Sequence, residues 1–340
     1  MGKRALEQRR LRAAVRMERV PLGATGVRVR RLVMGCAPLG GLFAPVAAQQ
    51  ARATVDAAWD LGVRTFDTAP HYGAGLSEQR LGAALRDRPR DEYVLSTKVG
   101  RLLVAGTPGE ATGADIFAES SGLGRVRDYR REGVRRSLEE SLDRLGLDRV
   151  ELVHVHDAQD HLDQAIGEAV PALVELREQG AIGAVSAGID YPAAAARFVR
   201  ESEVDCVLIA GRYTLLDQSA ATELLPLCRE RGVAVLSAAP FNSGVLADPR
   251  PGATYWYRPA PPDVVERAQR IAAVCERHAV RIATAALAFP LRHPAVSAVV
   301  VGVRSPEEIS IAVEALAAPP PEDLWAELAA EALVPAHPLP

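Results

Sequence analysis

The sequence predicts a single-domain (β/α)8 barrel, and three observations lead to this fold class. Between residues 31 and 316, short apolar runs rich in β-branched residues alternate with amphipathic helical stretches. The apolar runs are almost continuously hydrophobic, which is typical of parallel strands that helices cover. Eight such units follow one another without a linker-like stretch, so a closed barrel accounts for the pattern better than an open sheet does.

The eight expected strands are spread along the whole repeating region. We place them at residues 31–35, 63–67, 92–98, 150–156, 181–187, 204–210, 233–239 and 296–302. Helices are expected between them, for example at 48–62 and 129–146. The second of these carries Val134, Leu138, Leu142 and Leu145 at helical spacing.

Two longer segments, 101–128 and 245–262, lack a clear period and are expected to be irregular. Both follow an expected strand, and in a barrel the loops after strands surround the active site. Long loops in this position are usually functional. We therefore expect both segments to close over a substrate, with Trp256 or its neighbouring tyrosines as an apolar wall.

The two ends of the chain differ from the repeating region. Residues 1–17 are basic without an apolar stretch, which indicates a disordered extension rather than a secretory signal. The barrel is expected to span 18–334, with a proline break near Pro319, one short helix and a frayed tail at 335–340.

Composition excludes several functional classes. Hydrophobic residues make up 48% of the chain and charged residues 24%, which argues against disorder. The formal net charge of −3 and the lack of a long apolar run argue against nucleic-acid and membrane partners. The four cysteines are far apart, which suits a reducing, cytoplasmic location. The expected partner is a small-molecule sugar or aldehyde, bound by a monomer or homodimer.

Four chemically different side chains lie at or just after the ends of neighbouring strands. Asp67 ends the second strand, Tyr72 lies in the following loop, Lys98 ends the third strand and His156 ends the fourth. A buried Lys98 needs a partner, and Asp67 is available. A cation beside Tyr72 lowers the pKa of its phenol and makes it a usable general acid or base. The alternative is a structural Asp–Lys pair with a surface tyrosine.

A second alternative is a metal site formed by His154 and His156, which point to the same face of one strand. Such a site needs further ligands at other strand ends. Strands five to eight offer only Ala187, Ala210, Ala239 and Gly302 there, so we expect no metal. His154 is expected to be a hydrogen-bonded core residue.

The glycine-rich motifs that commonly bind phosphate in nucleotide-binding proteins are missing from the sequence. Gly73-Ala-Gly75 is followed by Glu78 where a third glycine belongs, which rejects a Rossmann motif. Two weaker signals point to the barrel mouth: the small and polar run 239–244, and Ser305-Pro306, which is typical of a helix N-terminus.

Taken together, these residues resemble the aldo-keto reductases. The resemblance rests on RTFDTAPHYGAGLSEQRLG, VLSTKVG and VELVHVHD, and it covers residues 31 to 316. It implies a catalytic tetrad of Asp67, Tyr72, Lys98 and His156 and a nicotinamide cofactor across the barrel mouth. Segments 35–43, 96–103, 210–218 and 240–246 look like the branch with L-fucose or D-threo-aldose 1-dehydrogenases and pyridoxal 4-dehydrogenases.

The resemblance also implies binding residues. Cofactor contacts are expected from Gly188, Asp190, Arg212, Pro240, Asn242, Ser243, Gly244, Leu246, Gly302, Arg304 and Glu308. Substrate contacts are expected from Leu39, Phe43, His71 and Trp256.

The chain departs from the family where the cofactor's carboxamide binds. Gly188-Ile189 and Ala210 replace the usual Ser-Asn and Gln, and Asp190 stands in for the asparagine. Ala238 replaces the tyrosine that usually stacks on the nicotinamide.

The cofactor is expected to be NAD, with NADP possible. Relatives that prefer NADP often carry a lysine and an arginine where this chain has Gly302 and Glu308. Glu308 repels a 2′-phosphate and can accept a hydrogen bond from a ribose hydroxyl. Arg304 is the counter-argument, because its guanidinium is able to bind a phosphate.

The expected function is oxidation of an aldose at C1 to the lactone, or of a related alcohol, by NAD(P). One alternative is a general NADPH-dependent carbonyl reductase. Another is a cofactor-binding regulatory protein on the same barrel, since fold does not determine function. The complete tetrad argues against a protein without activity.

Overall fold

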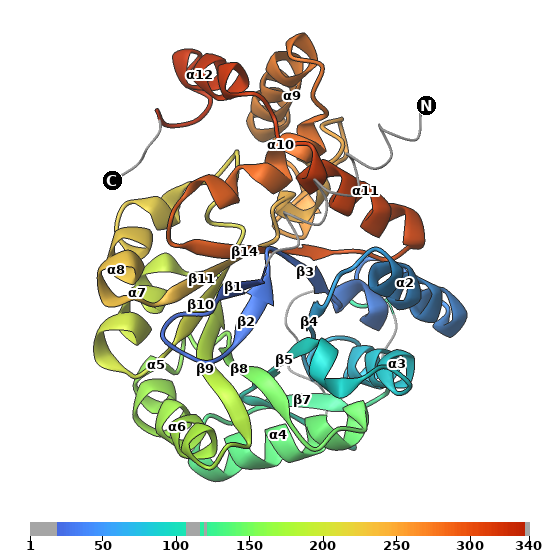
Figure 1. The fold of residues 1–340 in the computed structure, drawn as a ribbon, viewed down its shortest axis with the longest axis vertical. Helices are drawn as coiled ribbons and strands as arrows, with labels where there is room; N and C mark the ends of the chain where they lie inside the picture. The colour runs from blue at the N-terminus through green and yellow to red at the C-terminus, as the bar shows by residue number, and fades with distance from the viewer. Residues whose placement is uncertain (1–18, 107–115, 119–120, 337–340) are drawn as a thin grey trace.

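The computed structural model describes residues 19–106, 116–118 and 121–336 and contains a closed barrel of eight parallel strands (Figure 1). The strands succeed one another around the barrel in chain order, and the last pairs with the first. They are β3 (Leu32–Gly35), β4 (Thr65–Asp67), β5 (Val94–Val99), β8 (Val150–His156), β9 (Ile182–Ile189), β10 (Cys206–Ala210), β11 (Ala234–Ala238) and β14 (Val296–Gly302).

All eight predicted strands are present, which confirms the predicted (β/α)8 fold. The main correction concerns strand five, β9, which runs through Ile189 instead of ending at Ala187. Gly188 pairs with His156 on one side and with Leu208 on the other, so ladder hydrogen bonds extend the strand. The pair Gly188-Ile189 therefore belongs to the barrel wall and not to the loop after it.

The helices form the outer ring that Figure 1 shows, apart from α9 (Pro262–Arg277) and α12 (Glu322–Ala330), which pack against each other outside it. The helices of the ring are α2 (Ala48–Asp60), α3 (Leu76–Leu85), α4 (Arg131–Leu145), α5 (Leu162–Gln164), α6 (Val170–Glu178), α7 (Pro192–Glu201), α8 (Leu224–Arg231), α10 (Ile282–Ala288) and α11 (Pro306–Ala317). A π-helical stretch, Ala165–Ala169, joins α5 to α6.

Helix α4 confirms the helical spacing read from the sequence. Val134, Leu138 and Leu145 are buried on one face, and the helix ends at Gly146, whose left-handed backbone (φ 66°) suits a C-cap glycine. Such a stripe places the apolar face against the barrel and leaves the charged face to solvent.

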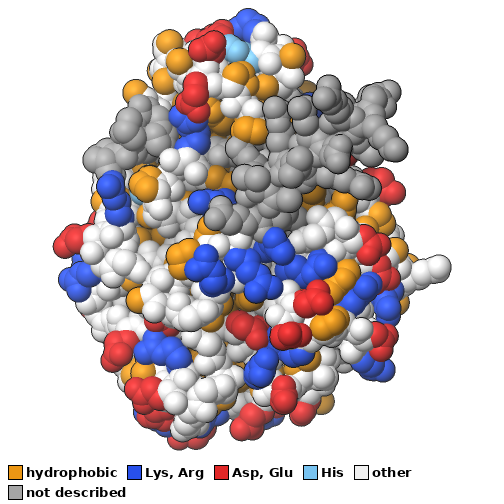
Figure 2. Space-filling view, in the orientation of Figure 1, with side chains coloured by type: hydrophobic (Ala, Val, Ile, Leu, Met, Phe, Trp, Pro, Cys, Tyr) orange, Lys and Arg blue, Asp and Glu red, His pale blue; other side chains and the backbone are white. Residues whose placement is uncertain are grey.

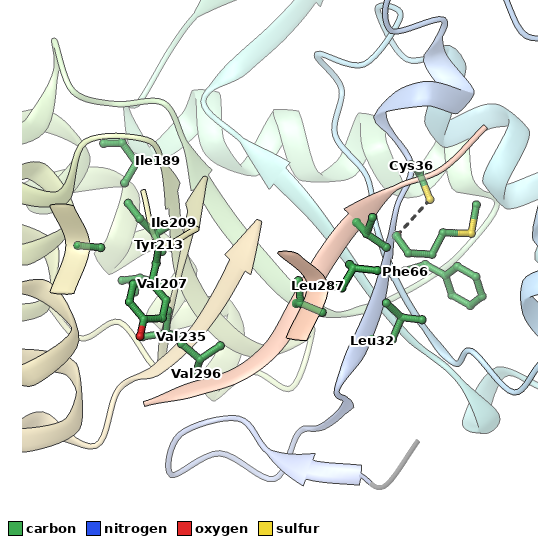
Figure 3. Close-up of a cluster of buried hydrophobic side chains, with 14 of the residues drawn as sticks. Leu32, Cys36, Phe66, Ile189, Val207, Ile209, Tyr213, Val235, Leu287 and Val296 are labelled. Atoms are coloured by element: carbon green, nitrogen blue, oxygen red, sulfur yellow. Dashed lines mark hydrogen bonds between the residues drawn. The ribbon is translucent and has the colours of Figure 1, made fainter. Parts of the chain in front are cut away.

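The hydrophobic core has two parts. The outer part lies between strands and helices and contains side chains such as Leu32, Phe66, Val207, Val235 and Val296, seen in Figure 3. The inner part fills the lower half of the barrel and includes the residues Val33, Leu152, Ala184, Leu208, Leu236 and Ala298. Burying each large side chain contributes roughly 1.5–3 kcal/mol.

A hairpin that the sequence analysis did not predict closes one end of the barrel. Strands β1 (Arg19–Pro21) and β2 (Arg28–Arg30) pair antiparallel and cross the barrel in Figure 1. Leu22 and Val29 are fully buried in the inner cluster. Gly23 has φ 59°, and a Cβ there would lie 2.6 Å from the carbonyl oxygen of Asp205, so this tight turn needs glycine.

Both long segments contain a short hairpin, so the prediction that they are irregular is wrong for their described parts. In the first, β6 (Arg101–Val104) pairs with β7 (Gly124–Arg127). In the second, β12 (Thr254–Tyr255) pairs with β13 (Arg258–Pro259) through the two residues Trp256 and Tyr257. Residues 107–115 and 119–120 lie outside the described residues.

The chain ends and the surface complete the description. The predicted extension 1–17 lies outside the described residues, as do 337–340 of the predicted tail, whereas the short helix after Pro319 is confirmed as α12. Within the described residues, no helix combines the length and apolar character needed to cross a membrane. All four cysteines are buried and free. Figure 2 shows basic and acidic side chains interspersed on one face of the molecule.

Candidate active site

A cavity of about 350 Å³ opens at the carboxyl ends of the barrel strands. Five of the strands contribute small residues to its lining, so backbone instead of bulky side chains forms much of the wall there. These small residues are Gly35, Gly188, Ala210, Ala238 and Gly302 at strand ends, with Gly211 just beyond β10. A wall of this kind leaves room for a flat ring to lie close to the backbone.

An ion pair between Asp67 and Lys98 lies at the bottom of the cavity. Lys98 Nζ donates to Asp67 Oδ1 at 2.8 Å, to Asp67 Oδ2 at 2.6 Å and to the carbonyl oxygen of Thr68 at 2.9 Å. These bonds use all three ammonium donors. Both side chains are almost fully buried, so each needs the other to offset the cost of losing water.

Two more side chains support Asp67. Ser96 Oγ donates to Asp67 Oδ1 at 2.8 Å, and His154 Nε2 lies 3.4 Å from the same oxygen. Burial opposes ionisation of Asp67, but the charge of Lys98 and the adjacent imidazole of His154 keep the pKa of this carboxyl well below its ordinary value. His154 is also hydrogen-bonded to Ser186 Oγ at 2.8 Å, which confirms the prediction of a hydrogen-bonded core histidine.

Close backbone packing positions Tyr72. A Cβ added at Gly40 would lie 2.6 Å from the carbonyl carbon of Tyr72, and one added at Gly73 would lie 2.5 Å from the carbonyl oxygen of Gly40. Only glycines allow this approach. The Tyr72 ring centroid lies 4.9 Å from Lys98 Nζ and 6.1 Å from the ring of His156, and the phenol lines the cavity.

The pKa of Tyr72 runs against the expectation from the sequence. Burial raises the pKa of the phenol well above its ordinary value, and the negative charge of Asp67 raises it further. Lys98 Nζ is in direct contact with Asp67, so the negative charge of this carboxylate offsets the effect of the ammonium on the phenol. The phenol therefore keeps its proton at neutral pH.

His156 ends strand β8 and lines the same cavity. Its Nε2 lies 3.5 Å from Asp157 Oδ2, and within the described part of the chain its buried Nδ1 has no hydrogen-bond partner. Burial lowers the pKa of His156 well below the ordinary value, and the charges of Arg101 and Lys98 lower it further. The neutral ring offers one donor and one acceptor to a ligand.

The structure thus brings Asp67, Tyr72, Lys98 and His156 together in the lining of one cavity. Seven other predicted site residues also line it: Gly188, Asp190, Asn242, Ser243, Gly302, His71 and Trp256. The ring of His71 lies 5.9 Å from that of His156, and burial is the main cause of its pKa being well below the ordinary value.

Eight predicted site residues do not line the cavity. They are Leu39, Phe43, Arg212, Pro240, Gly244, Leu246, Arg304 and Glu308. Leu39 and Leu246 are fully buried in the outer core, where helix packing needs them. Phe43 lies at the mouth, with its ring centroid 5.7 Å from that of Tyr257.

Arg212 lies behind the cavity wall. Its guanidinium carbon is 4.0 Å from the ring centroid of Trp256, and its Nε donates to the backbone oxygen of Asp190 at 2.8 Å. It also donates to a carboxylate oxygen of Asp217 at 3.1 Å. Arg212 therefore holds two cavity-lining residues in place.

Arg304 and Glu308 bind each other at the start of helix α11. The backbone N–H of Arg304 donates to Glu308 Oε2 at 2.9 Å, and Arg304 Nε lies 3.3 Å from Glu308 Oε1. Ser305 caps the helix by accepting from the backbone N–H of Glu308, as its sequence position predicts. The negative charge of Glu308 thus lies directly beside the cation that would attract a phosphate.

Several cavity residues were not predicted from the sequence, among them Phe117, Asp157, Gln159 and Tyr191, whereas Tyr257 is one of the tyrosines expected beside Trp256. Asp157 carried a usable signal, because it directly follows His156 in a quoted motif. The others come from loops, where neither period nor motif predicts which side chains turn inward.

Comparison with known proteins agrees with this geometry. Residues 31–331 match the family model described as Aldo/keto reductase family. The chain is 44% identical to the D-threo-aldose 1-dehydrogenase of a Pseudomonas species, covering 92% of this chain and 97% of that one. It is 40% identical to the pyridoxal 4-dehydrogenase of Microbacterium luteolum, covering 93% and 98% of the two chains.

A solved structure of an aldo-keto reductase is also similar to this chain. The holo form of aldo-keto reductase AKR11C1 from Bacillus halodurans superposes with a TM-score of 0.74 at 25% identity, covering 94% of this chain and 96% of that chain. With the barrel and its cavity, these similarities lead to one conclusion: the chain belongs to the aldo/keto reductase family and is an NAD(P)-dependent oxidoreductase.

Proposed function

We propose that the protein oxidises an aldose at C1 to the lactone, with NAD as the preferred cofactor. The observation that carries the substrate class is the 44% identity to D-threo-aldose 1-dehydrogenase along nearly the whole of both chains. The cavity supports it, because carboxylate, amide and imidazole groups line it beside aromatic rings. This mixture suits a ligand with several hydroxyl groups and apolar C–H faces.

The residues of the cavity fit a nicotinamide dinucleotide. Asn242 Oδ1 is buried and, among the described residues, has no hydrogen-bond partner, so it is ready to accept one from a ligand. The loop after β11 has positive φ at Ala239, Asn242 and Ser243, which turns the backbone tightly at the cavity edge. We assign Asn242, Ser243 and Asp190 to holding the cofactor; when bound, the nicotinamide supplies or accepts the hydride.

The four residues of the tetrad transfer the proton and orient the reacting oxygen. In oxidation, the ionised Tyr72 takes the proton from the C1 hydroxyl of the sugar. His156 is hydrogen-bonded to the same oxygen and orients it. Lys98 and Asp67 form the fixed pair beneath the phenol, and Tyr72 returns the proton when the reaction runs as reduction. Positioning and a polarised oxygen site account for most of the acceleration.

A second candidate, a general carbonyl reductase that uses NADPH, is favoured by one observation. The raised pKa of Tyr72 leaves the phenol protonated at neutral pH, which is the form that donates a proton to a carbonyl. Oxidation requires the ionised phenol, so we expect its rate to rise with pH into the alkaline range.

The assay that separates the two candidates is NADH and NADPH formation with L-fucose, D-arabinose, L-galactose and pyridoxal, beside reduction of simple aldehydes. We expect NADH formation with at least one aldose, increasing at alkaline pH. Reduction of aldehydes with NADPH, and no oxidation of any sugar at any pH, would replace the first proposal with the second.

The choice of NAD rests on Glu308 beside Arg304 and on Gly302, which has no charge. A 2′-phosphate near Glu308 meets a like charge, whereas a ribose hydroxyl finds an acceptor. We expect a higher kcat/KM with NAD than with NADP, and a shift toward NADP in Glu308→Arg. A wild-type preference for NADP contradicts this reading of the loop after β14.

A further inference from the structure

The loop that follows His156 presents a second acidic group to the cavity. Asp157 lines the cavity with its side chain 30% exposed, and its backbone has φ 46°. A positive φ is uncommon for any residue other than glycine, although Asp and Asn tolerate it best. This conformation turns the Asp157 carboxylate into the cavity, beside the imidazole of His156.

Three contacts hold the backbone in this conformation. The N–H of Asp157 donates to the carbonyl oxygen of Gly188 at 2.9 Å. The hydroxyl of Tyr129 donates to the carbonyl oxygens of His156 at 2.6 Å and Asp157 at 3.0 Å. Tyr129 in turn packs against Gly100, where a Cβ would lie 2.3 Å from its ring. The surroundings therefore impose the turn at Asp157.

Arg101 holds the carboxylate itself. Its Nη2 donates to Asp157 Oδ2 at 2.8 Å, and the arginine is only 5% exposed. A guanidinium is planar and permanently charged, so it fixes the orientation of the carboxylate that it binds. Arg101 reaches this position because Gly100, with φ 99°, turns the chain between Lys98 and strand β6.

One oxygen of Asp157 is left for a ligand. Oδ2 is bound by Arg101, whereas within the described residues Oδ1 receives no hydrogen bond. Gln159, two residues further along the same loop, also lines the cavity, and its buried Oε1 has no donor among the residues that the structure describes. Two free acceptors on one loop beside His156 are arranged to receive hydroxyl groups.

We infer that Asp157 is a substrate-binding residue that accepts hydrogen bonds from hydroxyl groups of the substrate next to its reacting carbon, and that Arg101 is the positioning residue that holds its carboxylate. This inference rests on the proposed function, because it names the groups by which the cavity distinguishes a polyhydroxy compound from a simple alcohol or aldehyde. Neither Asp157 nor Arg101 belongs to the tetrad.

The ligand class follows from the chemistry of these groups. A carboxylate and an amide oxygen accept hydrogen bonds but repel an anionic group, and Asp190 adds a further carboxyl to the cavity. Phe117, Trp256 and Tyr257 supply apolar surface for the C–H faces of a sugar ring. The site therefore fits a neutral polyhydroxy aldehyde or its hemiacetal, and not a sugar phosphate or a sugar acid.

The test compares two aldehydes that differ only in hydroxyl groups. Glyceraldehyde carries two hydroxyls beside its carbonyl, and propanal carries none. We expect the wild-type enzyme to prefer glyceraldehyde in kcat/KM, and Asp157→Asn to reduce the ratio of the two kcat/KM values roughly 10- to 100-fold, as expected for a bond to a charged acceptor. Asn is chosen because it tolerates positive φ.

Asp160→Asn is the matched control. Asp160 lies in the same loop and pairs with Arg127 of strand β7 at 3.0 Å, but it does not line the cavity. Its loss removes an ion pair between the same loop and the same β6–β7 hairpin, so the ratio should stay at the wild-type value. An equal fall of the ratio in Asp160→Asn would show that the hairpin contact, and not the carboxylate in the cavity, sets the preference.

Arg101 is tested by rescue. Arg101→Met should lower the ratio, mainly through a higher KM for glyceraldehyde, and Arg101→Lys should restore part of it because the charge remains. A lower kcat for both aldehydes at an unchanged ratio would reduce Arg101 to a structural role. Asp157→Asn keeps the shape of the side chain, so the inference does not depend on whether Arg101→Met folds.

The outcomes separate this inference from the proposed function. Failure of every aldose to be oxidised would remove the proposed function, while the glyceraldehyde-to-propanal ratio would still report on Asp157. A wild-type enzyme without preference for glyceraldehyde, or an Asp157→Asn variant with the wild-type ratio, would overturn the inference even if aldoses are substrates.

Discussion

The two ends of the barrel are built from the same strands and serve different purposes. Along strand β8, Leu152, His154 and His156 lie two residues apart and therefore share one face. At the lower level Leu152 packs with Ala184 in an apolar cluster that the β1–β2 hairpin covers. Higher up, His154 is bonded to Ser186, and His156 opens into the cavity beside Gly188.

The comparison shows how one alternating pattern yields both stability and chemistry. The lower end is an apolar cluster, and Leu22 and Val29 are fully buried there. The upper end holds a buried ion pair, polar atoms that lack partners among the described residues, and several non-glycine residues with positive φ, including Asp157, Asn242 and Ser243. Features of this kind reduce stability and gather where a ligand binds.

The sharpest test of the upper end is Tyr72→Phe. Only the phenolic oxygen and its proton are lost, so cofactor binding and folding should remain. We expect turnover to fall by roughly 10²- to 10⁴-fold, the usual contribution of general acid–base catalysis. The measurement is kcat in both directions, beside cofactor binding and the melting temperature; activity within a few-fold of wild type would remove Tyr72 from its role.

Lys98→Met is expected to affect both stability and catalysis, because Lys98 belongs to the buried ion pair and also lies beside Tyr72. Removing the cation leaves Asp67 buried and unpaired, which costs about 3–5 kcal/mol of unfolding free energy. It also leaves the negative charge beside Tyr72 uncompensated, so the pKa of the phenol rises further and oxidation moves to higher pH. Denaturant unfolding and a pH–rate profile check both effects, and an unchanged profile would separate Lys98 from the site.

Leu22→Ala tests the lower end alone. The side chain is fully buried in the inner cluster, so its truncation should destabilise the protein by roughly 2–5 kcal/mol. The cavity at the other end does not touch it, so kcat/KM should stay within about 2-fold of wild type at a temperature where the variant is folded. A large loss of activity in the folded variant would show that the two ends are coupled.

The acid dependence of stability tests the buried histidines of the upper end. Burial lowers the pKa of His154 and of His156, so both stay neutral in the folded chain while the unfolded chain takes up protons below about pH 6.5. The unfolded state then binds more protons, and stability falls as pH falls, by up to about 1.4 kcal/mol per histidine and pH unit. The pKa of Asp67 is also lowered, so this carboxyl adds to the fall below about pH 4. Melting temperatures from pH 8 to pH 5 check the sign; a flat curve contradicts it.

Much of this molecule was predictable from local patterns. The eight strands and helix α4 were predictable from the sequence. Strands buried on both faces give continuous apolar runs, and a helix buried on one face gives apolar residues at helical spacing. The tetrad followed from titratable residues at strand ends, which a barrel brings together. The β1–β2 hairpin and the two hairpins within the long segments were missed, since strands of two to four residues carry too little pattern to be recognised.

The sequence by itself determined the fold class, the family resemblance and the residues that meet at the barrel mouth. Only the tertiary structure decided what those residues do to one another. Burial raises the pKa of the Tyr72 phenol, and direct contact with Asp67 offsets the effect of Lys98, so this pKa rises instead of falling. Likewise, only the turn at Asp157 and the reach of Arg101 reveal a second acidic group in the cavity. Electrostatic effects depend on distances and burial within a few ångströms, and spacing along the chain does not encode them.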